Sequence, residues 1–429
     1  MKGMVWVTLF VLIGKIMGAA KEMAVAYRFG ISAEVDAYLF VFNFVSWPVG
    51  VWFSVLTVVL VPLVARDQHE SSGELSRFRS ELLGAALLLG VVIGGVVLLG
   101  LPAVLQSARG GLPQGTAEIA LHALPVFVLL VPLGVLISLL SAWMLAAGRH
   151  RNTLFEGIPA VIIGAVVLLS RNSSGIDALV WATVAGFTVH LISLAIPLLR
   201  RGELELPRFT YKARQWELFW KGFGIMLFGQ ALMSFVTIID QFFAVNVGVG
   251  AFATLGYANR ILALLMSLGG TVVSRATLPI FSNIHLRSGA QLQRVAANWA
   301  GVMFLVGAGL VVVAWLLAPV AIKLLFERGA FTAHDSAAVT EIFRYAIVQL
   351  PFYFAGLVLV SSLLSRGLHK YVAIGAVLNL IVKVCGNLLF VPLWGLKGVV
   401  ASSALMYCVS FLMLYICSIV IEKNKGKEN

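Results

Sequence analysis

Gly14-Lys-Ile-Met-Gly-Ala-Ala-Lys-Glu22 is a charged stretch inside an apolar run that begins at Met4. It places Lys15, Lys21 and Glu22 where a membrane-spanning helix is expected. A charge at mid-helix costs about 2.5–3.5 kcal/mol on insertion scales, so these side chains are expected to line a polar cavity and to avoid lipid. An alternative stays open, in which the lysines extend toward the membrane interfaces and Glu22 pairs with one of them.

The residues around this stretch add to the same site. After Phe29-Gly30 a short linker leads to Asp36, which opens the next apolar run and is expected near the outer rim of the cavity. Gly14 and Gly18 are four positions apart, a spacing that lets a neighbouring helix approach closely or lets the helix bend. The first two apolar runs therefore predict one polar site with charges of both signs.

The composition assigns the chain to the polytopic membrane proteins. Of its 429 residues, 60% are hydrophobic and 12% are charged, and mean hydropathy is +0.98, which excludes a soluble globular protein. The net charge of +12 does not indicate nucleic-acid binding, because the Lys and Arg residues lie in short loops between apolar runs. The three cysteines are expected to pack as small apolar residues.

At roughly 20 residues per span, this length accommodates about twelve transmembrane helices. The sequence contains twelve apolar runs. They lie near residues 4–28, 36–65, 80–105, 117–147, 153–170, 176–199, 216–245, 251–282, 295–325, 337–365, 371–392 and 397–421.

Basic residues gather in alternate loops, which predicts that both termini lie in the cytoplasm. The longest of these loops lies at the midpoint of the chain. We therefore expect an N-terminal six-helix bundle over residues 1–200, a cytoplasmic linker over 201–214 and a C-terminal six-helix bundle over 215–429.

The two halves resemble each other weakly. Pro132 and Leu145 match Pro351 and Leu364 at a shift of 219 residues, and a second group of matches, including Pro62 with Pro279, occurs at 217. An even number of predicted helices separates the matched points. A parallel internal repeat is expected, with its pseudo-two-fold axis along the membrane normal.

Further ionisable residues interrupt the later runs. Asp240 is a candidate for pairing with a cavity cation, or alternatively for a structural pair between helices. Arg260 carries the planar guanidinium that suits phosphate or pyrophosphate. Arg275 and Lys383 are candidates for the cavity or, alternatively, for interfacial anchors.

No enzymatic motif accompanies these charges. The chain has no Gly-x-Ser-x-Gly, no His-Glu-x-x-His and no phosphate-binding glycine loop. Cations within the membrane indicate transport of an anionic substrate, with no catalysis and no cofactor expected. Coupling to Na⁺, H⁺ or the membrane potential stays open.

The stretch from Gly14 to Gly30, together with Val35-Asp-Ala-Tyr38, resembles the MurJ/MviN lipid II flippases of the multidrug/oligosaccharidyl-lipid/polysaccharide (MOP) exporter superfamily. Further similarities are Tyr257-Ala-Asn-Arg260 and the segment Glu327-Arg-Gly-Ala-Phe-Thr-Ala-His-Asp335. The resemblance covers most of the chain in order. It implies a V-shaped pair of six-helix bundles around a central cationic cavity.

The resemblance also implies roles for individual residues. Lys15 and Lys21 stand at the positions of two cavity arginines, Glu22 and Asp36 at those of the family's acids, and Arg260 at that of a further arginine. The lysines lose bidentate geometry, and the arginine that the family has in its second helix is absent near Val49–Trp52. The sequence shows twelve runs, where this family has fourteen helices.

We therefore expect a flippase of the bacterial inner membrane that moves an undecaprenyl-pyrophosphate-linked saccharide, lipid II or a related glycan unit, by alternating access. Its expected partners are this lipid-linked glycan, the bilayer and proteins of glycan synthesis, with no nucleic acid. One alternative is a cation-coupled antiporter of small solutes or drugs from the same superfamily, with Asp240 and Glu22 as ion sites. Another is a membrane scaffold in a glycan-synthesis complex.

Overall fold

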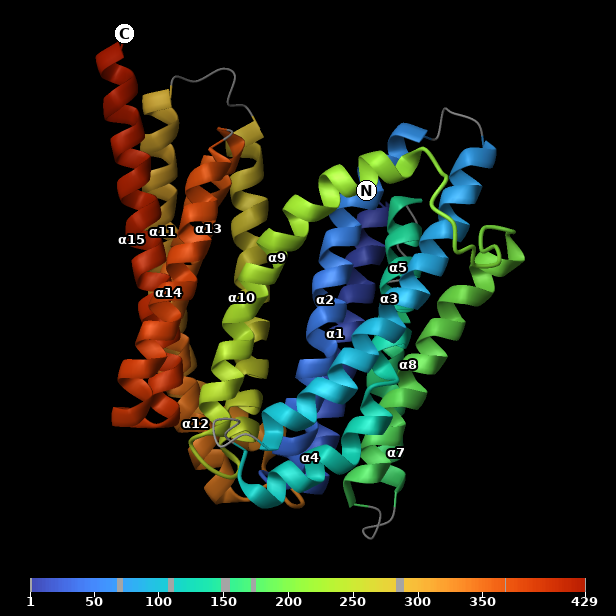
Figure 1. Cartoon of the computed structure of the whole chain (residues 1–429). Helices are drawn as coiled ribbons and strands as arrows, with labels where there is room; N and C mark the ends of the chain where they lie inside the picture. Colours follow the sequence, from blue (N-terminus) through green and yellow to red (C-terminus); the bar gives the residue numbers. More distant parts are fainter. Residues whose placement is uncertain are drawn as a thin grey trace. The chain divides into compact units, whose positions relative to one another are not determined.

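The computed structural model describes residues 2–67, 72–106, 112–147, 155–170, 175–282, 289–366 and 368–428, and every regular element in these ranges is helical (Figure 1). The helices are α1 Lys2–Phe29, α2 Ala33–Asp67, α3 Ser72–Gln106, α4 Gln114–Phe127, α5 Leu130–Ala146, α7 Ile158–Leu169, α8 Gly175–Arg200, α9 Gln215–Val245, α10 Ala251–Ser282, α11 Gly289–Phe326, α12 Ala333–Ala346, the 3₁₀ helix η3 Ile347–Gln349, α13 Leu350–Ser365, α14 His369–Trp394 and α15 Leu396–Glu428.

These helices coincide with the twelve predicted apolar runs. Among the described residues, eight helical spans are long and apolar enough to cross a membrane, and the bent pair α4 and α5 makes a ninth. The helices α1, α7 and α9 coincide with the three remaining runs. The prediction of an all-α polytopic membrane protein is confirmed.

The chain divides into two compact units, and the division falls inside α9. Unit 1 contains Met1–Ser234 and Arg328–Phe331, and unit 2 contains Phe235–Glu327 and Thr332–Asn429. We expected the second bundle to begin at residue 215. The first half of α9 belongs to unit 1 because Trp216 packs against Phe78 of α3, with ring centroids 5.2 Å apart. A single helix therefore begins in one unit and ends in the other.

Unit 1 is built from α1 to α8 and the first half of α9. Helix α2 packs against α4 and α5, α3 packs against α5, and α1 and α8 both pack against α7. The core contains large buried aromatic side chains, among them Tyr38, Phe78 and Phe127. The Tyr38 ring lies 5.4 Å from that of Phe127, and its hydroxyl is 3.1 Å from the hydroxyl of Thr183 on α8.

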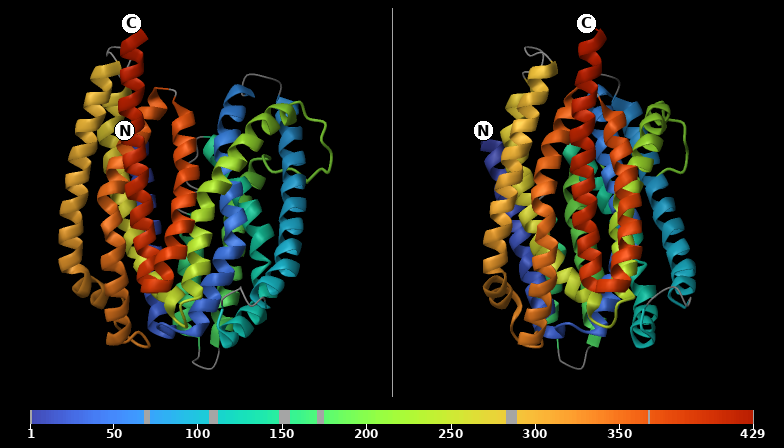
Figure 2. Two further views of the ribbon diagram at one scale, coloured as in Figure 1. Left: turned by 60° about the vertical axis from the view of Figure 1, so that its left-hand side comes forward. Right: turned by 90° about the vertical axis from the view of Figure 1, so that its left-hand side faces the viewer.

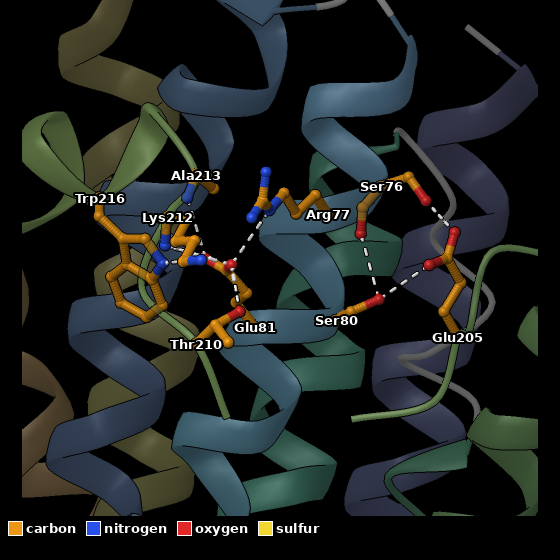
Figure 3. A network of polar contacts seen from close by, with 9 residues as sticks. All are labelled: Ser76, Arg77, Ser80, Glu81, Glu205, Thr210, Lys212, Ala213 and Trp216. Carbon is orange, nitrogen blue, oxygen red and sulfur yellow. Dashed lines mark hydrogen bonds and ion pairs between the residues drawn. The ribbon is translucent and has the colours of Figure 1, made fainter. Parts of the chain in front are cut away.

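The linker between α8 and α9 is docked onto α3 through one buried carboxylate (Figure 3). The Glu81 side chain accepts hydrogen bonds from the Thr210 hydroxyl at 2.6 Å, from the backbone N–H groups of Lys212 and Ala213, each at 3.0 Å, and from the Trp216 indole at 2.8 Å. Glu81 is fully buried, so these donors replace the water that an ionised carboxylate would otherwise require.

A second acid holds the linker further along. Glu205 accepts a hydrogen bond from the Ser80 hydroxyl at 2.8 Å and another from Ser76, while the Arg208 N–H donates to the Ser80 carbonyl at 2.9 Å. Gly84 makes this approach possible, because a Cβ there would lie 2.2 Å from the Arg208 carbonyl oxygen. The linker that we predicted over residues 201–214 is thus an ordered part of unit 1.

Unit 2 is built from the second half of α9 and from α10 to α15. Helices α14 and α15 run side by side (Figure 2), α11 packs against α13, and α10 packs against α12 and α13. An ion pair between Lys397 and Glu341, 2.6 Å apart and partly exposed, joins the start of α15 to α12.

Each unit contains one span that is broken before a proline. In unit 1, α4 and α5 meet at an angle of 50°. Pro132 has no N–H to donate to the Val128 carbonyl, which instead accepts from Val131 at 3.0 Å. In unit 2, Pro351 cannot donate to Ile347, whose carbonyl accepts from Leu350 in the 3₁₀ helix between α12 and α13.

The two prolines are also packed in the same way. A Cβ at Gly90 of α3 would lie 2.7 Å from Cα of Pro132, and a Cβ at Gly307 of α11 would lie 2.6 Å from Cα of Pro351. Each unit therefore has a glycine on its third helix that admits the backbone of the proline-containing span. This arrangement supports the internal repeat that we predicted from the same pair of prolines.

The turns between helices repeat as well. Gly30 and Gly250 have φ values of 57° and 79°, and Gly175 and Gly395 have φ values of 49° and 56°. Each pair is separated by 220 positions, and each glycine lies at the same place in its half, before the second or the last helix. Glycine is favoured there because side chains rarely tolerate a positive φ.

Candidate functional site

The charged stretch on α1 forms an ion pair within unit 1. The Lys21 ammonium lies 2.7 Å from the Glu22 carboxylate, and the two side chains are only 13% and 10% exposed. The pair lies where α1 packs against α7, since a Cβ at Gly164 of α7 would be 3.6 Å from Cα of Lys21. Lys15 is half-buried on the same helix. The alternative in which the lysines extend toward the membrane interfaces also predicted that Glu22 pairs with one of them, and this ion pair is present.

Asp36 lies in the first turn of α2 and is 2% exposed. Its position agrees with the expectation of an acid at a helix start. The positive end of the helix dipole stabilises a negative charge at that position. The same turn continues to Tyr38, whose hydroxyl contacts Thr183 inside unit 1. Asp36 is therefore part of the buried interior of unit 1, and its role as a substrate residue stays a prediction.

Unit 2 contains a second buried ion pair, which joins α9 to α14. The Lys383 ammonium lies 2.7 Å from the Asp240 carboxylate. It also donates to the Val399 carbonyl at 2.9 Å and to the hydroxyls of Ser402 at 2.8 Å and Ser403 at 2.5 Å. Lys383 is fully buried, so the alternative that it anchors the helix at the membrane interface does not hold. The alternative of a pair between helices holds for Asp240.

Sequence analysis did not identify the residues that complete this second pair. The Asn387 amide donates to Asp240 at 3.1 Å, and its carbonyl oxygen accepts a hydrogen bond from Ser402. The sequence could have indicated these partners, because Asn387, Ser402 and Ser403 are polar residues within apolar runs. A charge in one span needs polar partners in others, and small hydroxyls are the usual partners between membrane helices.

Helix α10 carries two of the predicted site residues, Arg260 and Arg275. Arg260 is exposed in the first third of α10, three residues after the buried Tyr257, whose ring packs 5.2 Å from that of Phe326. The side chain of Arg275 lies outside the described part of the structure. Both assignments to the substrate site therefore stay predictions.

The Phe-Thr segment that carried part of the resemblance has a local structural role. Thr332 caps α12, because its N–H donates to the Asp335 carboxylate at 2.8 Å and its hydroxyl accepts from the Asp335 N–H at 3.3 Å. Such a reciprocal cap satisfies two backbone donors at a helix start.

The fold and these buried charges define the class of protein. An all-α polytopic chain with ion pairs in its membrane-spanning helices is typical of transporters. A solved structure of "Lipid II flippase MurJ, inward closed conformation" matches with a TM-score of 0.83 and 19% identity, over 96% of this chain and 87% of that one. An inward-facing multidrug resistance MATE family transporter of the MOP superfamily matches with a TM-score of 0.80 and 16% identity, over 96% of both chains. The fold is therefore of the MOP type.

The family follows from sequence comparison. The profile of the family "Lipid II flippase MurJ" matches residues 25–424, so the chain belongs to this family. A probable lipid II flippase MurJ from Buchnera aphidicola subsp. Baizongia pistaciae is 22% identical over 433 residues, which cover 97% of this chain and 82% of the relative. The resemblance to this family that the sequence motifs indicated is confirmed.

Proposed function

We propose that this chain is a flippase that moves a polyprenyl-pyrophosphate-linked glycan, lipid II or a closely related unit, across the bacterial cytoplasmic membrane by alternating access. The observation that carries the proposal is the charged stretch of α1, where Lys15, Lys21 and Glu22 lie within one membrane helix of a MurJ-family chain. Charged side chains within an apolar membrane helix cost free energy, and binding of an anionic substrate explains why the helix carries them.

In this proposal Lys21 binds the pyrophosphate, and Glu22 takes the place of the phosphate when no substrate is present. The two side chains lie 2.7 Å apart and are largely buried. Glu22 thereby keeps the ammonium positioned and neutralised, and an incoming phosphate exchanges with the carboxylate. Lys15 and Arg260 supply further positive charge, and Asp36 orients or releases these cations as the transporter changes state.

The basic loops support an orientation with both termini in the cytoplasm. Residues 200–214 carry a dense group of Arg and Lys between α8 and α9, and such residues are retained on the inner side of the membrane. The pyrophosphate head would then enter the transporter from the cytoplasm.

The test is binding and flipping by the purified protein. Charge-assisted hydrogen bonds contribute about 1.5–3 kcal/mol each, which corresponds to about 10- to 150-fold in affinity. Lys21→Ala should weaken binding of a polyprenyl-pyrophosphate glycan in nanodiscs by at least about tenfold at fixed salt. Lys21→Arg should retain binding and flipping in proteoliposomes, because it keeps the charge.

The chain offers a matched control in Lys221. This lysine also pairs with an acid at 2.7 Å, Glu217, but the two side chains are 70% and 78% exposed on the first half of α9. Lys221→Ala should therefore leave binding unchanged. Equal binding by Lys21→Ala and Lys221→Ala would contradict the proposed site, and transport of small cations without any glycan binding would favour the antiporter alternative.

A further inference from the structure

The linker between α8 and α9 separates its charges by sign. Its two acids contact unit 1: Glu205 accepts hydrogen bonds from Ser76 and Ser80 of α3 (Figure 3). Glu203 is half-buried and lines a small cavity together with Arg79 of α3. The basic side chains are all exposed, namely Arg200 at the end of α8, Arg201, Arg208, Lys212 and Arg214. The exposed side of residues 200–214 therefore carries positive charge only.

Large apolar side chains lie on the same exposed side. Leu206 is 86% exposed, Phe209 is 61% exposed and Tyr211 is 58% exposed. The Tyr211 ring is held by that of Trp216, with the ring centroids 4.9 Å apart. Apolar and aromatic side chains between arginines and lysines are typical of segments that lie in a membrane interface.

Helix α3 indicates the depth at which the linker lies. The linker contacts this helix between Ser76 and Gly84. After Glu81 the sequence has no ionisable residue before Arg109. A membrane-spanning helix needs about 20 apolar residues, so the hydrocarbon region begins close to Leu82 on this helix. The linker is therefore expected at the level of the lipid headgroups.

Contacts within unit 1 fix the backbone of the linker. Glu81 accepts hydrogen bonds from the backbone N–H groups of Lys212 and Ala213, and the Ser80 carbonyl accepts one from the N–H of Arg208. Because these contacts use the backbone, the side chains of Arg208 and Lys212 stay exposed. A segment that is already ordered loses less conformational entropy on binding than a flexible one. A row of cations on an ordered backbone suits phosphate groups.

We propose that the exposed side of this linker is a binding surface for the anionic phospholipids of the leaflet in which it lies, the cytoplasmic leaflet in the orientation given above. Leu206, Phe209 and Tyr211 lie at the boundary between the headgroups and the acyl chains. The basic side chains around them bind the lipid phosphates. This surface takes no part in the proposed substrate site on α1, and its lipid contacts do not depend on glycan transport.

The first experiment measures the depth of the linker in nanodiscs that contain no glycan. Leu206→Cys is introduced into a chain whose three free cysteines, Cys385, Cys408 and Cys417, are replaced by Ala, and a fluorophore is attached to it. Phosphatidylcholine that is brominated near the top of its acyl chains quenches a fluorophore that it contacts. We expect quenching close to that at Leu99→Cys, a position that is 80% exposed on the apolar part of α3.

Two outcomes of this experiment are decisive. Quenching at position 206 supports insertion of the linker into the interface. Quenching at position 99 without quenching at position 206 would place the linker in water. That result would overturn the proposal and leave the apolar side chains of the linker for a soluble protein partner.

The second experiment identifies the lipid. The same labelled Leu206→Cys chain is studied in phosphatidylcholine nanodiscs with increasing fractions of brominated phosphatidylglycerol or of brominated phosphatidylcholine. Each Lys or Arg near an anionic membrane surface strengthens the attraction about fivefold, so half-maximal quenching should need at least about fivefold less phosphatidylglycerol than phosphatidylcholine. High salt should reduce this preference, because exposed charges are screened.

The variant that tests the charges is Arg208→Gln/Lys212→Gln/Arg214→Gln. It keeps the backbone donors that dock the linker onto α3, so brominated phosphatidylcholine should still quench, whereas the preference for phosphatidylglycerol should be lost. The control is Lys221→Gln, which removes an exposed lysine that is paired with Glu217, and it should keep the preference. Equal quenching by the two lipids before the charges are changed, or a preference that persists in the triple variant, would overturn the assignment of an anionic lipid.

Discussion

Replacing Glu81 by Gln should release the linker from α3 while leaving the membrane-spanning helices folded. One oxygen of this buried carboxylate accepts from Lys212, Ala213 and Trp216. Gln has the same shape as Glu, but only one of its two terminal atoms is an oxygen. Either its NH₂ group faces the N–H donors of the linker, or it faces Thr210 and the hydrogen bond from the Thr210 hydroxyl is lost. A hydrogen bond to a charged group contributes about 1.5–3 kcal/mol, so losing the equivalent of one bond should raise the undocked population about 10- to 150-fold.

Limited trypsin digestion measures this population, because Arg208, Lys212 and Arg214 place cleavage sites within the docked segment. When opening is fast relative to cleavage, the rate of cleavage follows the population of the open form. We expect cleavage of the linker to be at least about tenfold faster in Glu81→Gln than in the wild-type protein.

The matched control is Glu217→Gln, which changes an exposed acid on the adjacent first turns of α9. It should leave linker cleavage at the wild-type rate. Equal rates in Glu81→Gln and the wild-type protein would mean that the carboxylate does not hold the linker, and the account of this buried network would have to be abandoned.

Three further predictions concern packing, charge and topology. Gly307→Ala should destabilise unit 2 by about 1–3 kcal/mol, because its Cβ would overlap a proline backbone, whereas Gly309→Ala on the same helix, which meets open space, should be neutral or slightly stabilising; thermal denaturation would show both effects. Glu22→Gln should reduce glycan flipping with little loss of folded protein, and full activity would assign Glu22 to structure. Cysteines introduced within 200–214 should react from the cytoplasmic side and those within 329–335 from outside; the reverse pattern would contradict the orientation.

Much of the fold could be predicted because membrane spans are encoded locally, in runs of apolar residues. The positions of the helices followed from that signal alone. The break between α4 and α5 was less evident, since 117–147 is one continuous apolar run, although Pro132 marks the point where a backbone donor is missing. The docking of the linker onto Glu81 was not predictable, because it depends on backbone N–H groups that no sequence pattern distinguishes.

The candidate sites were predictable only in part. An ionisable residue in an apolar run is visible in the sequence, which is why Lys21, Glu22, Asp240 and Lys383 were all identified. Which charge pairs with which depends on tertiary packing. Lys21 pairs with its neighbour in the chain, whereas Asp240 and Lys383 are far apart in sequence and meet only because α9 and α14 do.

The glycine turns and packed prolines show what the two halves of this chain have kept in common, and the charges show what they have not. At the 220-residue spacing of the turns, Asp240 corresponds to Ala20, Lys383 to Ile163 and Lys15 to Phe235. No ionisable residue of this comparison has an ionisable counterpart. The two halves thus share their glycine turns and their packed prolines, whereas the buried charges of each half are its own, so the shared backbone arrangement tolerates different polar chemistry in each unit.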